Sequence, residues 1–339
     1  DGTLTERLHR TSFRMHAELA ETLGVESYRS IPTLQIQSGT GDLRSSEDRP
    51  WLSGPCEQEL LDDGEMTAQV DPRELTMKLL EAAQAHGATL RYGEVVGIET
   101  EADEGKRRVT GVTVSDRDGA HSVLDCERVV TALGPWSCKL EDWLGLPLPL
   151  EGVWSTSLVW KSEDVQQPAA LFMKQDTNGC NLEVYPRSNG DVYVCGCGES
   201  RLVSADELRA NELTPEQANE PDRNRAAAAQ SSLSRFCQFA EREPDVQQAC
   251  MRPCSPDGLP LLGQFRAVHG AYVAAGHNCW GILWAPVTGL AMAELIIDGE
   301  TSCVNLKPFS PNRYDTPVYR VLATQRGRRR RDEPLGEQW

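Results

Sequence analysis

The sequence predicts a mixed α/β fold, and three stretches of the chain carry that prediction. Residues 271–298 read in succession as a strand, a glycine-bearing turn and a helix. Residues 71–98 begin with a well-marked helix start and continue into β-forming segments. Residues 147–197 contain longer alternating apolar runs, which are typical of a sheet. Helices and strands are therefore expected to be mixed along the chain.

The chain is expected to open with a helix and a strand. The apolar residues of segment 5–23 recur on roughly one helical face, and Gly24 is a typical helix stop. These apolar residues are Leu8, Phe13, Met15, Leu19 and Leu23. Residues 30–37 alternate enough to predict a strand. The polar segment 40–64 is expected to be a surface loop with at most one short helix, and Trp51 in it a packing anchor.

A second helix should begin at Asp71, because Asp is a good N-cap and is followed by Pro72 and, three residues after the cap, by Glu74. Gly87 should end it. The expected core face comprises Leu75, Leu79, Ala82, Ala83 and His86, the last also serving as a cation at the helix C-terminus. Strands are predicted at 89–92 and 95–98, followed by a hairpin across 109–114 and 122–124.

The middle of the chain predicts a turn and then a separate sheet. Residues 129–137 read as a buried strand that enters a glycine turn and a helix. Strands are predicted at 153–160 and 182–185, and a hairpin turn at 185–191 leads into a strand at 192–195. Residues 199–225 are acidic and irregular, and a helix is expected at 226–239. The basic tail after residue 316 is expected to be disordered.

The turn at residues 276–286 organises the rest of the prediction. Gly276 and Gly281 permit backbone angles that other residues avoid, and Pro286 suits the first turn of the helix that follows. Such a turn points backbone N–H groups and a helix dipole at one spot, which favours an anion. Alone, this pattern is equally typical of an ordinary loop before a helix.

Two linked motifs near the end of the chain resemble the D-amino acid oxidase and glycine oxidase family of FAD-dependent amine oxidoreductases. The first is Arg252-Pro253, followed by Asp257-Gly258-Leu259-Pro260-Leu261-Leu262-Gly263, and the second is Gly281-Ile282-Leu283-Trp284-Ala285-Pro286-Val287-Thr288-Gly289. The core Asn278-Cys279-Trp280 is most similar to a fungal and plant branch of FAD oxidoreductases that has no settled substrate. The resemblance therefore implies an FAD-dependent oxidoreductase and leaves the substrate open.

The resemblance also implies which residues hold FAD. The segment Ala132-Leu133-Gly134-Pro135-Trp136-Ser137 matches a motif that covers part of FAD in the family, and Val95 or Val96 would contact adenine through the main chain. The implied cofactor-binding residues are Val95, Val96, Ala132, Gly134, Trp136, Asp257, Gly258, Gly276, His277, Cys279, Trp280, Gly281 and Ile282. The implied reaction is hydride transfer from the α-carbon of a small amine or amino acid to the flavin, with no buried general base required.

Three residues are the candidates for catalysis: Arg252, His277 and Tyr185. Arg252 would hold a substrate carboxylate with two parallel donors, the alternative being an ion pair with a core acid. His277 would tune proton transfer near the flavin, or else be a loop histidine bonded to the backbone. Tyr185, with Arg187, would line the substrate site, provided that the strand turns these side chains the right way.

Two cysteines and a tryptophan leave questions open. Cys279 and Trp280 differ from the residues of the glycine oxidase motif, so the resemblance does not imply glycine or a D-amino acid as the substrate. Trp280 would form a wall of the site. Cys250 stands seven residues before Asp257, the offset at which related sarcosine oxidases bind flavin covalently. The surrounding Arg-Pro pattern is that of the non-covalent branch, which is the expectation here.

Composition narrows the function classes. The 339-residue chain has a formal net charge of −17, which disfavours nucleic-acid binding. Its eleven cysteines lack the spacing of a zinc site or a disulfide framework, so no metal is expected and a cytoplasmic location fits. No run of about 18 apolar residues predicts a membrane span. A small-molecule amine or amino acid is the expected partner, and the oligomeric state stays open.

A domain division follows from the resemblance. No Gly-x-Gly-x-x-Gly fingerprint occurs in the chain, so we expect a fragment or an incomplete gene product that lacks the first βαβ unit of its cofactor domain. An incomplete, discontinuous FAD-binding domain is expected from residues 1–24, 67–149 and 254–315. An antiparallel or mixed substrate sheet is expected from residues 25–66 and 150–253, and a basic tail from 316–339.

Two alternative functions remain at this point. An FAD-dependent dehydrogenase of a hydroxy acid would use Arg252 in the same way, because a guanidinium binds any carboxylate. A non-enzymatic trafficking or binding relative of the family would explain the absent fingerprint.

Overall fold

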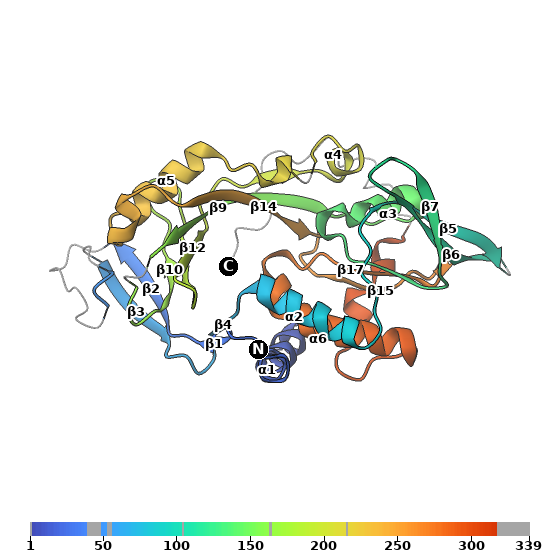
Figure 1. Ribbon diagram of the computed structural model, residues 1–339, viewed down its shortest axis with the longest axis horizontal. Helices are drawn as coiled ribbons and strands as arrows, with labels where there is room; N and C mark the ends of the chain where they lie inside the picture. The colour runs from blue at the N-terminus through green and yellow to red at the C-terminus, as the bar shows by residue number, and fades with distance from the viewer. Residues whose placement is uncertain are drawn as a thin grey trace.

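The computed structural model describes residues 2–38, 49–52, 56–103, 105–162, 165–214 and 216–316, and these form a mixed α/β fold. The largest sheet among the described residues has eight strands (Figure 1). Its spatial order is β13-β9-β12-β11-β10-β2-β3, with β14 also paired to β9. The strands are β2 (Thr33–Ser38), β3 (Cys56–Asp62), β9 (Glu151–Lys161), β10 (Ala170–Met173), β11 (Glu183–Pro186), β12 (Asp191–Cys195), β13 (Arg201–Val203) and β14 (Val246–Cys254). Only β10 and β2 pair in parallel within this sheet.

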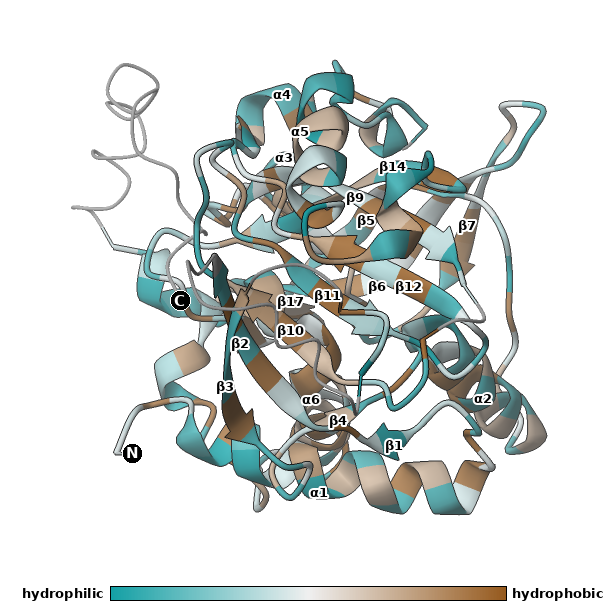
Figure 2. Cartoon of the chain, turned by 90° about the vertical axis from the view of Figure 1, so that its left-hand side faces the viewer, coloured by the Kyte–Doolittle hydropathy of each residue, from teal (hydrophilic) through white to brown (hydrophobic). Residues whose placement is uncertain are grey.

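One face of this large sheet packs against helix α5 (Arg223–Leu233). Strand residues Leu158, Val184 and Val194 are fully buried in one core with Leu233 of the helix. Figure 2 shows that the strands carry hydrophobic stretches while the loops around them are largely hydrophilic. Trp51 also lies in this core, which confirms its prediction as a packing anchor. Side chains alternate between the two faces along a strand, so the neighbours of these residues in the sequence point to the opposite face of the sheet.

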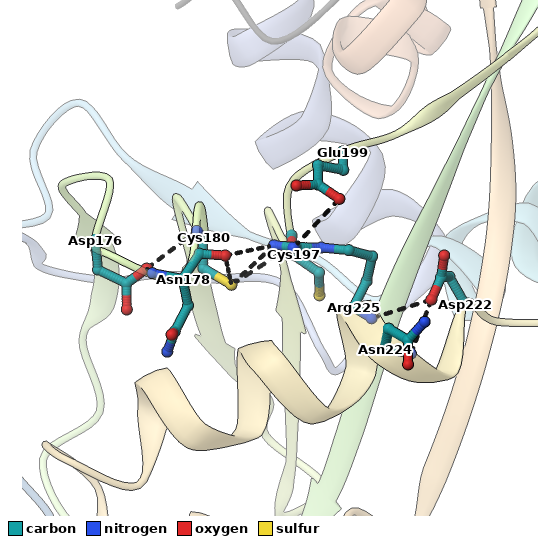
Figure 3. Close-up of polar contacts among 8 residues, drawn as sticks. All are labelled: Asp176, Asn178, Cys180, Cys197, Glu199, Asp222, Asn224 and Arg225. Atoms are coloured by element: carbon teal, nitrogen blue, oxygen red, sulfur yellow. Dashed lines mark hydrogen bonds and ion pairs between the residues drawn. The ribbon is translucent and has the colours of Figure 1, made fainter.

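A buried guanidinium joins α5 to the loops at the end of this sheet (Figure 3). Arg225 is 8% exposed, and its Nε donates to the Cys197 carbonyl at 2.8 Å. Its Nη2 donates to the Asn178 carbonyl at 3.0 Å, and Glu199 lies 3.6 Å from Nη1. Since α5 begins just before Arg225, with Asp222 capping it, one side chain links the helix start to two turns.

Two smaller sheets stand beside the large one. One has the order β15-β17-β8, from β15 (Leu261–Gln264), β17 (Ala271–Ala275) and β8 (Val129–Thr131). The other has the order β16-β6-β5 with β7 paired to β6, from β5 (Glu94–Asp103), β6 (Lys106–Ser115), β7 (His121–Asp125) and β16 (Val268–His269). They share a core with α3 (Leu140–Leu144), centred on Leu140, Leu261 and Val268. Strands β1 (Arg29–Ser30) and β4 (Ala68–Gln69) form a two-stranded ribbon.

Helix α1 (Glu6–Leu23) packs against helix α6 (Gly281–Ile297). The buried residues of α1 are Leu8, Ser12, His16 and Ala20. Leu8 of the predicted face is therefore confirmed, but Phe13 and Leu19 are only partly buried. The cause lies in α6, where Pro286 is inside the helix and not in its first turn as predicted. Proline cannot donate to the carbonyl four residues earlier. His16 Nε2 is 3.0 Å from that carbonyl, of Ile282, and a polar stripe on α1 thus faces α6.

Helix α2 (Pro72–Ala85) begins as predicted but buries less than predicted. Asp71 accepts from the backbone N–H groups of Arg73 and Glu74, and His86 Nδ1 lies 2.8 Å from the Ala82 carbonyl near the helix end. Only Leu75 of the expected core face is buried, because α2 packs here on a small cluster with Ala20 and Val25.

Four further predictions about elements need correction. Segment 56–62 is strand β3, not loop, because an edge strand tolerates polar side chains; residues 40–48 and 53–55 lie outside the described residues. No strand forms at 89–92, whose residues have no pairing partner in the described chain.

Segment 199–225 contains β13, α4 (Ala205–Arg209) and a 3₁₀ turn at 217–219. The helix expected at 226–239 is α5, from 223 to 233, followed by a 3₁₀ turn at 238–241. The expected basic tail lies almost wholly outside the described residues.

By length and composition alone, segment 278–297 is apolar enough to cross a membrane, which the sequence analysis did not anticipate. A core helix meets the same criterion, and α6 packs against α1 and β15. The observation is therefore weak evidence for a span.

Candidate active site

Arg252 lies on β14, on the face of the large sheet opposite α5. In the antiparallel pair of β14 and β9, Arg252 faces Val153 and Cys250 faces Ser155. The Nη2 of Arg252 donates to Ser155 Oγ at 3.1 Å, and Ser155 Oγ lies 2.8 Å from Ser200 Oγ. The guanidinium is thereby fixed in direction by a hydroxyl pair.

The parity of the hairpin β11–β12 settles where Tyr185 points. Val184 and Val194 face each other and are buried in the core under α5, so Tyr185 and its partner Tyr193 point to the other face. The two tyrosine rings stack with centroids 6.4 Å apart, and the Arg187 guanidinium lies 5.1 Å from the Tyr193 ring. Arg187 also pairs with Asp71 at 3.3 Å. Tyr185 and Arg187 therefore share the sheet face of Arg252.

The predicted glycine turns converge at one edge of the β15-β17-β8 sheet. Strands β8 and β17 are parallel, so Ala132 and Gly134 after β8 lie beside Gly276 after β17. The carboxyl ends of parallel strands are where ligands bind in open α/β sheets. A Cβ on Gly276 would lie 3.7 Å from Pro260 Cα and 3.1 Å from a Leu150 methyl group. The Asp257–Pro260 turn thus closes on the same place.

The start of α6 offers uncapped backbone donors at this edge. Its N-cap residue, Trp280, makes no side-chain capping hydrogen bond, and Asn278 before it has a φ of 51°. The Asn278 Oδ1 atom is buried and has no hydrogen-bond partner within the described residues. A turn with a positive φ and a buried unpaired polar atom, next to a helix start that no side chain caps, fits the polar edge of a flavin.

His277 is anchored within this turn. Its Nε2 lies 3.1 Å from Thr288 Oγ1, about two turns into α6. Burial lowers the pKa of His277 to about 4, so its imidazole is neutral at neutral pH. The hydrogen bond to a side chain replaces the backbone bond considered from the sequence. A catalytic role for His277 stays a prediction.

Cys279 lies near enough to Arg252 for their charges to interact. Burial raises the pKa of Cys279 and the positive charge of Arg252 opposes that rise, so the two groups act on each other across the site. Strand β14 also contacts the 3₁₀ turn that holds Cys279. The Trp280 ring stacks on Trp284 at 6.0 Å and meets His9 of α1 edge-on at 4.9 Å. Trp280 is 37% exposed and packs against α1, and its place as a wall of the site stays a prediction.

The remaining predicted cofactor residues occupy different surroundings. Asp257 is held by Arg313, with Nε–Oδ2 and Nη2–Oδ1 distances of 2.8 and 3.0 Å. Burial alone raises the pKa of Asp257, but the hydrogen bonds and charge of Arg313 bring it down to about 2. Its carboxylate thus serves the turn, and a ligand contact here would come from the Asp257 or Gly258 backbone.

Trp136 directly follows one of the turns, and the two valines lie in another sheet. Trp136 follows Gly134 in a 3₁₀ helix (Gly134–Lys139) and is partly buried against the core of the smaller sheets. Val95 and Val96 lie on β5, at a β-bulge, in a sheet separate from β8 and β17. Gly281 and Ile282 begin α6, with the Ile282 side chain exposed.

Glu183 is a site residue that the sequence analysis missed. It faces Cys195 in the β11–β12 register, on the same side as Tyr185, and is 7% exposed. The Tyr185 hydroxyl donates to its Oε2 at 2.5 Å. Burial raises the pKa of Glu183, while the Tyr185 and Cys195 hydrogen bonds and the Arg252 charge lower it in part. The alternation around Tyr185 was the available signal, because Glu183 stands two residues earlier.

The described residues contain neither a disulfide nor a cluster of metal ligands. All eleven cysteines are free thiols. Among the described residues, no group of three or more His, Cys, Asp or Glu side chains is placed to hold a metal ion.

Comparison with known proteins agrees with this geometry. The family model DAO, described as FAD dependent oxidoreductase, matches residues 3–295. The chain is 27% identical to TDA3 of Saccharomyces cerevisiae, over 73% of this chain and 51% of TDA3. It is 25% identical to C1F5.03c of Schizosaccharomyces pombe, over 91% of this chain and 83% of that protein. The chain thus spans only about half the length of TDA3.

Glycine oxidase of Geobacillus kaustophilus is similar in both sequence and structure. The sequences are 31% identical over 73% of this chain and 58% of the enzyme. Its crystal structure superposes with a TM-score of 0.71 at 21% identity, covering 92% of this chain and 84% of that chain. The L-proline dehydrogenase of P. horikoshii superposes with a TM-score of 0.66 at 17% identity, covering 92% of this chain and 83% of that chain.

Proposed function

This chain belongs to the DAO family of FAD-dependent oxidoreductases, and from that premise we propose that it oxidises the C–N bond of a small amine or amino acid. The bound FAD would accept a hydride from the substrate carbon next to nitrogen, which is chemistry that the cofactor itself supplies. The observation that carries the proposal is that Arg252 lies close to the turn that holds Cys279. The two motifs had linked these segments only by their order in the sequence.

Arg252 would bind the substrate carboxylate. A guanidinium presents parallel donors that match a carboxylate, and a charge-assisted pair in a partly buried site is stronger than a neutral hydrogen bond. Ser155 holds one Nη2 donor of Arg252 at 3.1 Å, which limits rotation of the group. A substrate carboxylate bound there would be oriented before reaction, and that orientation lowers the entropic part of the barrier.

The aromatic residues of the hairpin would enclose the substrate. Tyr185 stacks with Tyr193 and meets Phe172 edge-on at 6.1 Å. These rings share the sheet face of Arg252, so they would shield its ion pair from water. Shielding strengthens an electrostatic contact, because the local dielectric constant falls.

The residues present fit FAD at the convergent turns. The turns at 132–134, 257–260 and 276–281, with the uncapped start of α6, would hold the flavin ring by backbone groups. We extend the proposal to the domains: residues 1–24, 67–149 and 254–315 would form the cofactor side, and residues 25–66 and 150–253 the substrate side.

The test is reduction of the bound flavin under anaerobic conditions. The FAD-loaded protein is mixed with a panel of amines, amino acids and matched hydroxy acids, and the flavin absorbance near 450 nm is followed, a typical position for oxidised flavin. Bleaching by an amine or amino acid supports the proposal. Bleaching by hydroxy acids alone would favour the dehydrogenase alternative, and a protein that binds no FAD would favour a non-enzymatic relative.

Oxygen then separates oxidase from dehydrogenase. Release of hydrogen peroxide on admission of air identifies an oxidase. Slow reoxidation in air with rapid reoxidation by an artificial acceptor identifies a dehydrogenase.

A further inference from the structure

Glu183 brings a carboxyl group into the site that contains Arg252. It lies on β11, where the alternation turns Val184 into the core and Glu183 and Tyr185 to the opposite face. Cys195, its partner across the hairpin, lies at 3.5 Å from Glu183 Oε2 and donates to it. The Arg252 charge acts on both Glu183 and Cys195. Glu183 therefore belongs to the Arg252 site and not to the core beneath α5.

Both hydrogen bonds recorded for the Glu183 carboxyl reach the same oxygen. The Tyr185 hydroxyl and the Cys195 thiol each donate to Oε2. Neither donor is charged, and the ion pairs recorded among the described residues do not include Glu183 with Arg252. A buried carboxylate without a directly bonded cation is costly, and a cationic ligand would remove that cost.

An anionic and a cationic side chain in one site suit a ligand that carries both opposite charges. An amino acid at neutral pH is such a ligand, with an ammonium group a few bonds from its carboxylate. A hydroxy acid of the same size offers the carboxylate alone, and an amine without a carboxylate offers the ammonium alone.

We propose that Glu183 recognises the protonated nitrogen of the substrate while Arg252 binds its carboxylate, so that the site selects substrates bearing both groups, and that the ammonium passes one proton to the Glu183 carboxylate before the hydride leaves the neighbouring carbon. This inference rests on the proposed function and deepens it, because it assigns the amine specificity to a named side chain. The groups that face Glu183 are Tyr185 of its own strand, Cys195 of β12, Arg252 of β14 and Cys279 of the glycine turn.

The experiment measures binding without turnover. 2-Aminoisobutyrate carries an ammonium and a carboxylate but no hydrogen on its α-carbon, so the flavin cannot oxidise it. Trimethylacetate has nearly the same shape, with a methyl group in place of the ammonium. Calorimetric titration of both ligands into the FAD-loaded protein gives their affinity ratio. We expect 2-aminoisobutyrate to bind at least about tenfold more tightly.

The variant Glu183→Gln keeps the shape of the side chain and removes its charge. We expect the affinity ratio to fall to about one, with trimethylacetate binding within about twofold of the wild type. Glu199→Gln is the matched control, because Glu199 is 76% exposed and pairs with Arg225 away from the site; its ratio should equal that of the wild type. A Glu183→Gln protein that keeps the full preference for 2-aminoisobutyrate would overturn the inference.

The failure of the inference and that of the proposed function give different results. Binding of neither ligand by the wild type would overturn both. Binding of both ligands, with Glu183→Gln unchanged from the wild type, would overturn the Glu183 role alone. If Glu183→Gln does not fold, Tyr185→Phe replaces it: removal of the hydroxyl donor leaves the carboxylate in place, and the preference must persist or increase. Its loss in Tyr185→Phe would contradict the inference.

Discussion

The Nε2 atom of His16 lies 3.0 Å from the carbonyl oxygen of Ile282, the group that Pro286 leaves without its helical donor. In a second contact between the helices, the Val287 N–H donates to Ser12 Oγ at 3.2 Å. Through these two contacts, side chains of α1 bond to backbone groups of α6 beside Pro286, where the helical hydrogen bonding is interrupted. The start of α6 also forms the glycine turn. The position of α6, and therefore that of the glycine turn, depends on contacts with a helix about 270 residues earlier in the sequence.

Replacement of His16 should therefore destabilise the protein in a way that depends on Pro286. We expect His16→Leu to lower the free energy of unfolding by about 1–3 kcal/mol, because the Ile282 carbonyl becomes unsatisfied. In a Pro286→Ala background the restored N–H would serve this carbonyl, and the cost of His16→Leu should fall below about 1 kcal/mol. Urea denaturation of the four proteins measures the coupling. Equal costs in both backgrounds would show that His16 acts by packing alone.

Arg225 should be one of the most sensitive positions outside the site. Arg225→Met leaves the Cys197 and Asn178 carbonyls without their donor, and we expect a loss of about 3–5 kcal/mol. Glu199→Gln should cost less than about 1 kcal/mol, because its pair with Arg225 is largely exposed to water. Thermal or urea denaturation compares them. Similar losses for the two variants would mean that the ion pair, not the carbonyl network of Figure 3, holds the loops.

The neutral state of His277 predicts a pH dependence of stability. Burial lowers the folded pKa to about 4, below the unfolded value of about 6.5, so the unfolded chain binds the extra proton. The stabilisation is complete above about pH 6.5 and is lost as the pH falls towards 4, by at most about 1.4 kcal/mol per pH unit. Urea denaturation at several pH values should show a shallower dependence for His277→Gln than for the wild type. The exposed His121→Gln is the control, and an unchanged slope in His277→Gln would refute the assignment.

The flavin is expected to be bound without a covalent link. Cys250 lies on the site face of β14 with part of its surface exposed, but desolvation by the atoms around its sulfur raises the pKa of the thiol, and Arg252 offsets that rise only in part. A protonated thiol is a poor nucleophile. Acid precipitation of the FAD-loaded protein should therefore release free FAD into the supernatant. A yellow pellet that becomes colourless in Cys250→Ser would demonstrate a covalent bond.

Local signals in the sequence predicted much of the fold. The cap at Asp71, the hairpin at 185–191 and the strand-turn-helix at 271–298 are all decided by residues close to one another in the chain, and the structure has them. The edge strand β3 was missed because its polar residues face solvent at the rim of the sheet, where the pattern of a strand and that of a loop coincide.

Features that depend on distant pairing could not be predicted in the same way. The polar stripe Ser12–His16 makes sense only once Pro286 is known to lie opposite it. Glu183 was not singled out from the sequence, because the face of its strand becomes known only with the register of β11 on β12. The motif predicts Trp280 as a wall of the site. The structure shows its ring packed against His9 of α1 and Trp284 of α6, contacts that the sequence did not indicate.

The role of Arg252 is tested most directly by comparing two substrates in one variant. Take an amino acid that reduces the flavin, and the matching amine that lacks the carboxylate. In Arg252→Gln we expect kcat/KM for the amino acid to fall by about 10²-fold or more, because a charge-assisted pair is lost, while kcat/KM for the amine stays within about threefold. Equal changes for both substrates, or none for either, would contradict the assignment of Arg252 as the carboxylate-binding residue.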